Sequence, residues 1–410
     1  MENSKKRWLI LAASCFVTLC AGSLYAWSVF ASPMAEYLSG LTGREIGSLA
    51  VVFTVANAVG PITMICGGTV NDRIGPRSVL LIGGLIFGAG MIGAGFSRSV
   101  GALILSYGLG VGLGCGMIYG TVVSNAVKFF PDKSGFVGGL TTACYGGSSI
   151  LVPLIASALM RRFPVTSAFK LIGAGMLVLM CASAFVIEKA PDAPTAAAGE
   201  SRGVDLNWRE MIRDRRFLLM LLILTCGAFA GMMFISQAAV IAQRMMGFAS
   251  GAACVSLLAL FNTLGRLAAG TLSDRVGPTG TLRITFVGSL LAGVLLFFCA
   301  EGRLVLFYLG LALTGFCFGS IMGIYPGFTA GQFGRKNNSV NYGIMFIGFA
   351  LAGLFGPSLM NLLHGATGRY QPAFLVSAAL AALGELLLVF LNRAIRNAQE
   401  ERPIATNRIR

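Results

Sequence analysis

Twelve long apolar runs dominate this sequence of 410 residues. A helix needs about 20 consecutive apolar residues to cross the ~30 Å hydrocarbon core of a bilayer. Strands of a membrane barrel would instead show segments of about 10 residues with alternating polarity, and these runs do not alternate. We therefore predict an all-α integral membrane bundle of 12 transmembrane helices, at residues 8–31, 46–70, 78–97, 102–126, 135–160, 166–187, 217–241, 250–272, 283–300, 305–328, 341–362 and 372–393.

The composition excludes a water-soluble globular protein. Hydrophobic residues make up 56% of the chain and charged residues 11%, whereas about 25% of the residues in a typical soluble domain are charged. So few charges cannot cover the surface of a soluble chain of this length. The lipid bilayer is therefore the expected solvent for most of the surface.

The formal net charge of +15 is explained by where the charges lie. Of the 31 Lys and Arg residues, 22 fall on the side of the membrane that holds the N-terminus and every second loop, eight fall on the other side, and one lies within a span. Cytoplasmic loops carry the excess of Lys and Arg. We expect a multi-pass protein of the plasma (inner) membrane with both termini in the cytoplasm, and no nucleic-acid partner.

Disulfides, cofactors and metals are not expected. All ten cysteines lie in apolar segments and none forms a C-x-x-C pair, which is typical of small buried residues. The glycine-rich run from Gly108 to Gly116 lacks the spacing of a dinucleotide-binding motif and lies within a span, so close helix packing explains it better.

The longest polar stretch divides the chain into two similar halves. We predict an N-terminal six-helix half at 1–188, a cytoplasmic central loop at 189–215 and a C-terminal six-helix half at 216–410. GTVNDRIGPR follows the second span and GTLSDRVGPT follows the eighth, so that Asp274 comes 202 residues after Asp72. A repeat of half the chain length indicates two pseudo-symmetric halves that arose from one unit.

Each copy of the repeat is a cytoplasmic turn that can act as a gate. Asp72 and Arg73 in the first copy, and Asp274 and Arg275 in the second, lie where a helix ends. Such an Asp can pair with an Arg or cap the N-terminus of a neighbouring helix, and so hold the cytoplasmic face shut in one state. The alternative is a plain turn with solvated charges.

The twelve spans, the central loop and the doubled G-x-x-x-D-R-x-G resemble the major facilitator superfamily. The resemblance covers essentially the whole chain. It implies a secondary transporter that works by alternating access, with its substrate site between the two halves.

Arg266 and Glu385 are the two ionisable residues well inside predicted spans. A buried Arg costs about 2.5–3.5 kcal/mol on insertion scales, so it is expected to face a cavity and bind something there. A guanidinium matches a carboxylate bidentately, and Asn262 lies on the same helix face, where it can orient the guanidinium or bond the substrate. The alternatives are a structural Arg266–Glu385 pair, snorkelling of Arg266 to the cytoplasmic face, and a packing role for Asn262.

Because the first half has Met64 where the second has Arg266, the fixed charge is one-sided and favours a monoanion. Tyr25, Tyr119 and Tyr325 lie inside spans and supply neutral hydrogen-bond donors, with core packing as the alternative. Three further tyrosines are less distinctive: Tyr107, Tyr145 and Tyr342.

Several segments resemble the oxalate/formate antiporter family and the related monocarboxylate transporters: GSLYAWSVFASPM, GCGMIYGTVVSNAVKFFPDKSG, IYPGFTAGQFG and NYG at 341–343. The resemblance implies that Arg266 binds the substrate carboxylate and that the aromatic residues at 25, 119 and 325 line the site. The oxalate transporter has a second cation where this chain has Phe349, which suits an apolar wall and makes oxalate doubtful. Animal monocarboxylate transporters have an Asp that takes part in proton coupling where this chain has Asn262. The resemblance therefore does not imply the same proton route for this chain.

The sequence therefore predicts a transporter of small monocarboxylates such as lactate, pyruvate or formate, with a proton as co-substrate. Glu385 is the intramembrane candidate for a proton carrier, and the alternative is a Glu satisfied by a neighbouring helix. A carboxylate anion exchanger of the oxalate/formate type is the second candidate. An enzyme is not expected, because no catalytic cluster of His, Asp or Glu lies within the spans. We expect a monomer.

Overall fold

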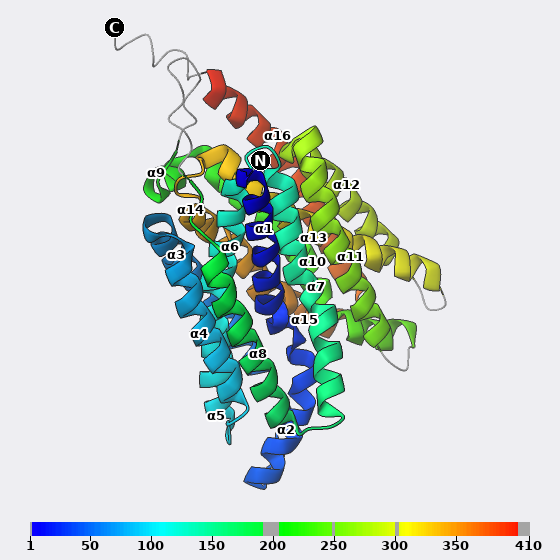
Figure 1. Cartoon of the computed structure of the whole chain (residues 1–410). Coiled ribbons are helices and arrows are strands. Elements are labelled where there is room, and N and C mark those ends of the chain that lie inside the picture. The colour runs from blue at the N-terminus through cyan, green and yellow to red at the C-terminus, as the bar shows by residue number, and fades with distance from the viewer. Residues whose placement is uncertain (1, 192–204, 248–250, 300–302, 401–410) are drawn as a thin grey trace. The chain divides into compact units, whose positions relative to one another are not determined.

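The computed structural model describes residues 2–191, 205–247, 251–299 and 303–400 (Figure 1). All regular structure in these ranges is helical. Twelve helical segments there are long and apolar enough to cross a membrane, and each coincides with one of the twelve predicted spans. The predicted membrane bundle is therefore confirmed at the level of its elements.

The chain divides into two compact units, described in turn. Unit 1 comprises residues 1–205 and 326–344, and unit 2 comprises residues 206–325 and 345–410. The segment 326–344 groups with unit 1, whereas the predicted halves assign it to the C-terminal side.

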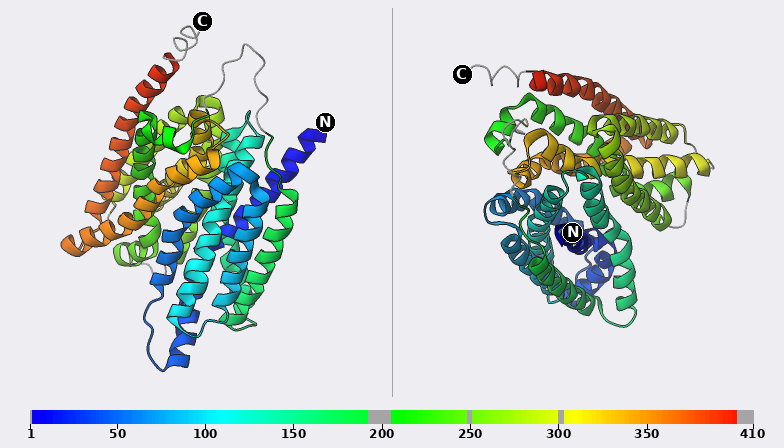
Figure 2. Two further views of the ribbon diagram at one scale, coloured as in Figure 1. Left: turned by 90° about the vertical axis from the view of Figure 1, so that its left-hand side faces the viewer. Right: turned by 45° about the horizontal axis from the view of Figure 1, so that its top comes forward.

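Unit 1 contains the first six spans, whose helices lie side by side in Figure 2 in blue to green. Its elements are α1 (Glu2–Ala21), η1 (Gly22–Ala26), α2 (Trp27–Thr42), α3 (Ala50–Ile74), α4 (Pro76–Ala94), α5 (Val100–Leu103), η2 (Ile104–Val111), α6 (Gly112–Phe129), α7 (Ser134–Met160) and α8 (Val165–Val186). The first span is longer than predicted, because the helix continues past Pro33 and ends at Gly43, whose φ of +64° favours glycine.

Unit 2 contains most of the second six spans. Its elements are α9 (Trp208–Arg213), α10 (Arg215–Met246), α11 (Ala252–Val276), α12 (Pro278–Phe297), most of α13 (Leu304–Phe333), α15 (Ile347–Thr367) and α16 (Gln371–Glu400). The short helix α14 (Asn338–Met345) precedes α15 and lies almost wholly in unit 1.

Two of the spans in unit 1 are interrupted by other helix types. The first span changes to a 3-10 helix at η1, and the fourth contains the π-helix η2. Such interruptions often mark functional positions in a helix. In the first span the interruption begins at Gly22, where a Cβ atom would overlap the backbone oxygen of Tyr145 on α7.

Small residues and apolar surfaces explain how the helices pack. Gly112 and Gly116 of the glycine-rich run lie against the backbone of α3 at Ala56 and Gly60, which confirms the close packing that the sequence predicts. Large apolar side chains such as Phe185 and Val305 are 70% and 73% exposed, as suits a surface that faces lipid. All ten cysteines lie in the described ranges, and none of them forms a disulfide.

Candidate functional site

Arg266 of α11 is a buried cation of unit 2, with 2% of its surface exposed. Its Nε–H donates to Oδ1 of Asn262, one helical turn earlier, at 3.0 Å. Because the amide is neutral, it orients the guanidinium without cancelling its charge. The predicted partnership of Asn262 with Arg266 is present.

A glycine stripe on α13 fixes this part of α11. Three glycines spaced four residues apart meet three α11 residues of the same spacing, with Gly315 against Leu258, Gly319 against Asn262 and Gly323 against Arg266. A Cβ atom on Gly319 or Gly323 would overlap a backbone oxygen of α11. The two backbones therefore touch directly, and the position of Arg266 is set by close contact of main chains.

Phe349 of α15 belongs to an aromatic group within unit 2. Its ring stacks on Phe346 with centroids 4.5 Å apart and lies 6.4 Å from the ring of Phe318 on α13. Two aromatic rings therefore lie near Phe349, and its role as an apolar wall for the substrate stays a prediction.

Tyr325 of α13 is 1% exposed, and its hydroxyl donates to the backbone oxygen of Met220 on α10 at 2.7 Å. A hydroxyl has one hydrogen to donate, so in this conformation that hydrogen is used between two helices. This is the core-packing alternative considered for the tyrosines, and a contact with substrate stays a prediction.

A tyrosine cluster lies in unit 1. The ring of Tyr145 on α7 is 5.5 Å from the ring of Tyr25 in η1 and 4.6 Å from the ring of Tyr119 on α6. The hydroxyl of Tyr145 lies 3.4 Å from Sγ of Cys115. The structure thus brings Tyr25 and Tyr119 to a common neighbour, which sequence reasoning missed because Tyr145 resembles other tyrosines within the spans.

Glu385 of α16 forms an ion pair with Arg283 of α12, with Oε1 2.8 Å from Nε. Their side chains are 32% and 52% exposed. The neighbouring helix α12 therefore supplies the partner of Glu385, which is the alternative to a proton carrier that the sequence left open. A role for Glu385 in proton coupling stays a prediction.

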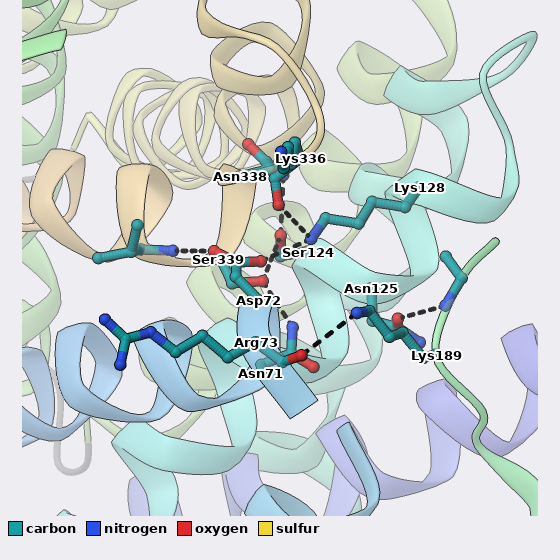
Figure 3. A network of polar contacts seen from close by, with 12 residues as sticks. Asn71, Asp72, Arg73, Ser124, Asn125, Lys128, Lys189, Lys336, Asn338 and Ser339 are labelled. Atoms are coloured by element: carbon teal, nitrogen blue, oxygen red, sulfur yellow. Dashed lines mark hydrogen bonds and ion pairs between the residues drawn. The ribbon is translucent and has the colours of Figure 1, made fainter. Parts of the chain in front are cut away.

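The turn that the sequence predicts as the first gate is part of a polar network in unit 1 (Figure 3). The carboxylate of Asp72, at the end of α3, accepts hydrogen bonds from Nζ of Lys128 on α6 at 2.6 Å and from the backbone N–H of Val340 in α14 at 3.1 Å. Lys128 also donates to the backbone oxygen of Lys336 at 3.2 Å. Asp72 thus lies at the N-terminus of α14, one of the two arrangements expected for it, and its cationic partner is a Lys. Arg73 is exposed.

Neutral side chains extend this network into the interior. Asn71 donates to Oγ of Ser339 at 2.6 Å, Ser339 donates to Oγ of Ser124 at 3.0 Å, and Asn338 donates to the same oxygen at 2.9 Å (Figure 3). Each of these four residues is at most 2% exposed. Buried hydrogen bonds of this kind are costly to break singly, because the remaining partner loses both water and its bond.

The chain after α8 is bound to the same region. Asn125 of α6 donates to the backbone oxygen of Glu188 and accepts from the backbone N–H of Ala190. Lys6 and Arg77 lie 2.7 and 3.4 Å from the Glu188 carboxylate. The hydrogen bond from Lys6 lowers the pKa of Glu188 below its ordinary 4.5, with Arg77 adding a smaller effect. A lowered carboxyl pKa stabilises the fold above that ordinary value, and the contribution is lost as the pH falls through the folded-state pKa.

The turn predicted as the second gate differs from the first. Asp274 and Arg275, at the end of α11, are both exposed. At the repeat offset of 202 residues, Lys128 corresponds to Ala330, Ser124 to Pro326, and Ser339 to Val137. These three side chains of the network are therefore not repeated in sequence, although the turn itself is.

In the described parts of the chain, no group of three His, Cys, Asp or Glu residues could hold a metal ion. In the described residues, twelve helices long and apolar enough to cross a membrane, together with a turn motif that occurs twice in the sequence, define a multi-pass membrane protein built on a repeat. The chain belongs to the Major Facilitator Superfamily, whose family model matches residues 11–340. It is thus a transporter and not an enzyme.

Three comparisons describe its similarity to known members. The chain is 30% identical over 391 residues to the oxalate:formate antiporter of Oxalobacter formigenes, covering 94% of this chain and 91% of that protein. It is 26% identical to monocarboxylate transporter 11 of Mus musculus, covering 95% and 88%. The solved proton:xylose symporter XylE has the same fold, with a TM-score of 0.74 and 13% identity over 94% of this chain and 96% of that one.

Proposed function

We propose that this transporter carries small monocarboxylates, of the size of lactate, pyruvate or formate, by alternating access. In this proposal Arg266 binds the carboxylate and Asn262 holds the guanidinium in place. Phe349 contacts the carbon end of the substrate, and Tyr25, Tyr119 and Tyr325 provide hydrogen bonds or contact area. Similarity to an oxalate:formate antiporter and to a monocarboxylate transporter supports this substrate class.

The observation that carries the proposal is the burial of the Arg266 guanidinium, while position 349 holds a Phe with aromatic neighbours and so adds no second cation. A single positive charge neutralises a monoanion, whereas the second charge of a dicarboxylate would be desolvated without a partner. The cost of that second charge favours monocarboxylates.

Proton symport is the proposed coupling. A carboxylate bound at Arg266 cancels the charge of the site, and a proton that moves with the substrate keeps transport electrically balanced. Exchange of one carboxylate for another is the second candidate, which the 30% identity to the oxalate:formate antiporter favours.

The deciding experiment is uptake of labelled L-lactate into proteoliposomes with and without an inward proton gradient. Protein-free vesicles control for passive entry of the protonated acid, and Arg266→Ala serves as the binding-defective variant. Gradient-dependent accumulation that the variant lacks supports symport, whereas uptake only into carboxylate-preloaded vesicles means exchange. Undiminished uptake by the variant refutes the role of Arg266, and an absence of transport in both conditions refutes lactate as substrate.

For gating, we propose that Asp72 and Arg73, together with Asp274 and Arg275, close the cytoplasmic side in one state of the cycle. The contacts of Asp72 with Lys128 and with α14 support this proposal, since they join three elements through one carboxylate. We also propose the plasma (inner) membrane as the location, with both termini cytoplasmic.

A further inference from the structure

The short helix α9, directly before α10 in unit 2, is closed by specific contacts at both ends. At its start, the side chain of Asn207 accepts from the N–H groups of Arg209 and Glu210, and Glu210 accepts from the N–H of Asn207. After its end, Asp214 caps α10 and binds the side chain of Arg216. These reciprocal bonds define a separate helical turn before the membrane span.

The side chains of α9 divide into two adjacent exposed faces. Trp208 and Ile212 are four residues apart, so they share one face, and they are 42% and 44% exposed. Arg209 and Arg213 share the neighbouring face and are also exposed. Met211 is fully buried, which fixes the rotation of the helix and keeps the apolar and basic faces outward.

The position of α9 along the chain places it at a membrane surface. The apolar span Arg215–Phe234 begins two residues after α9 ends, and six helical residues extend only about 9 Å. Trp is enriched at the boundary between lipid and water. Arg215, also exposed, adds a third cation at this depth, whereas Arg216 is held by Asp214.

We propose that α9 is an interfacial helix that binds anionic phospholipids of the cytoplasmic leaflet. Trp208 and Ile212 enter the boundary between headgroups and acyl chains, and Arg209, Arg213 and Arg215 contact lipid phosphates. Charge complementarity identifies the partner, because the cytoplasmic leaflet presents negative headgroups to which each nearby Lys or Arg is attracted.

Trp208 itself reports on this binding. The chain has three tryptophans, so Trp8→Phe together with Trp27→Phe leaves Trp208 as the single emitter. This variant is reconstituted in vesicles of phosphatidylcholine and phosphatidylglycerol at low salt, with bromine on the acyl chains of one lipid or the other at equal mole fraction. Brominated phosphatidylglycerol should quench the fluorescence of Trp208 more strongly than brominated phosphatidylcholine does. We expect the difference to correspond to an enrichment of phosphatidylglycerol around Trp208 of about two- to five-fold.

The matched variants separate specific binding from overall charge. Arg209→Gln with Arg213→Gln should remove the enrichment, and high salt should reduce it. Arg393→Gln with Arg396→Gln removes the same charge from exposed positions on α16 and should leave the enrichment unchanged. Equal quenching by the two lipids, or the same enrichment in both double variants, overturns the proposal. If the double Phe variant does not fold, the difference between the unmodified chain and Trp208→Phe gives the same readout.

Discussion

At the scale of single residues, the Arg266→Lys variant tests whether substrate binding requires the planar guanidinium or only its positive charge. Arg266→Lys keeps the positive charge but loses the planar fork and the Nε–H that Asn262 accepts. We expect KM for a monocarboxylate to rise about 10- to 100-fold, the loss of one charge-assisted hydrogen bond. Arg283→Lys, in the ion pair with Glu385, is the matched control. An unchanged KM in Arg266→Lys would show that the fork is not used.

Substitutions of Phe349 test whether the number of positive charges in the site determines the charge of the preferred substrate. Phe349→Lys adds a second cation to the aromatic group of α15, and we expect the preference to shift from monocarboxylates toward dicarboxylates, because a second negative charge then has a partner. Competition of labelled lactate by unlabelled mono- and dicarboxylates measures the shift. Phe349→Leu removes the ring without adding charge, and a similar shift in that variant would point to size instead.

At the scale of elements, the glycine stripe of α13 should be intolerant of any side chain. Gly319→Ala puts a Cβ atom into the backbone oxygen of Asn262, so one helix must move. We expect a loss of about 1–3 kcal/mol in stability, together with reduced uptake, since α11 also carries Arg266. Gly331→Ala on the same helix is the control, because it has open space around it. Thermal unfolding in detergent distinguishes the two, and equal midpoints would contradict the backbone contact.

The ion pair between Asp72 and Lys128 should be energetically coupled. The two side chains are only 7% and 15% exposed, so removing one partner leaves the other charge poorly solvated. In a double-mutant cycle of Asp72→Asn and Lys128→Met, we expect a coupling of about 1–3 kcal/mol. Reversible unfolding in mixed micelles provides the measurement.

The exposed pair of Arg77 and Glu188 is the comparison for that cycle, with side chains 53% and 40% exposed. Water and salt screen such a pair, so its cycle should show no measurable coupling. Similar results for both pairs would mean that burial does not strengthen the contact of Asp72.

At the scale of the whole molecule, the sequence predicts the features that a bilayer requires, above all the membrane-spanning helices. Apolar length and the distribution of Lys and Arg are written directly along the chain, so all twelve spans were found. The partners of Tyr25, Tyr325 and Glu385 were not predictable, because a tyrosine or carboxylate within a span looks the same whether its neighbour is Tyr145, a backbone oxygen or Arg283. The hydrogen bond between Arg266 and Asn262 was predictable, since residues four apart in a helix lie on the same face.

The orientation of the chain is a testable property at this scale. Because 22 of the 31 Lys and Arg residues lie on the side of the termini, we expect both ends to remain in the cytoplasm. Alkaline phosphatase, which is active only outside the cytoplasm, should be inactive when fused after Arg410 and active when fused to a chain truncated after Gly247. The reverse pattern would invert the assignment of every loop.

The contact between α11 and α13 restricts how such a transporter can acquire a new substrate in evolution. Replacement of Gly319 or Gly323 by any larger residue collides with main chain, which no side-chain rearrangement can relieve. Position 349 on α15 has aromatic side chains for neighbours, and these can change rotamer. Single mutations that alter specificity are therefore expected to be more accessible on α15 than at the glycines of the helix pair that positions the guanidinium.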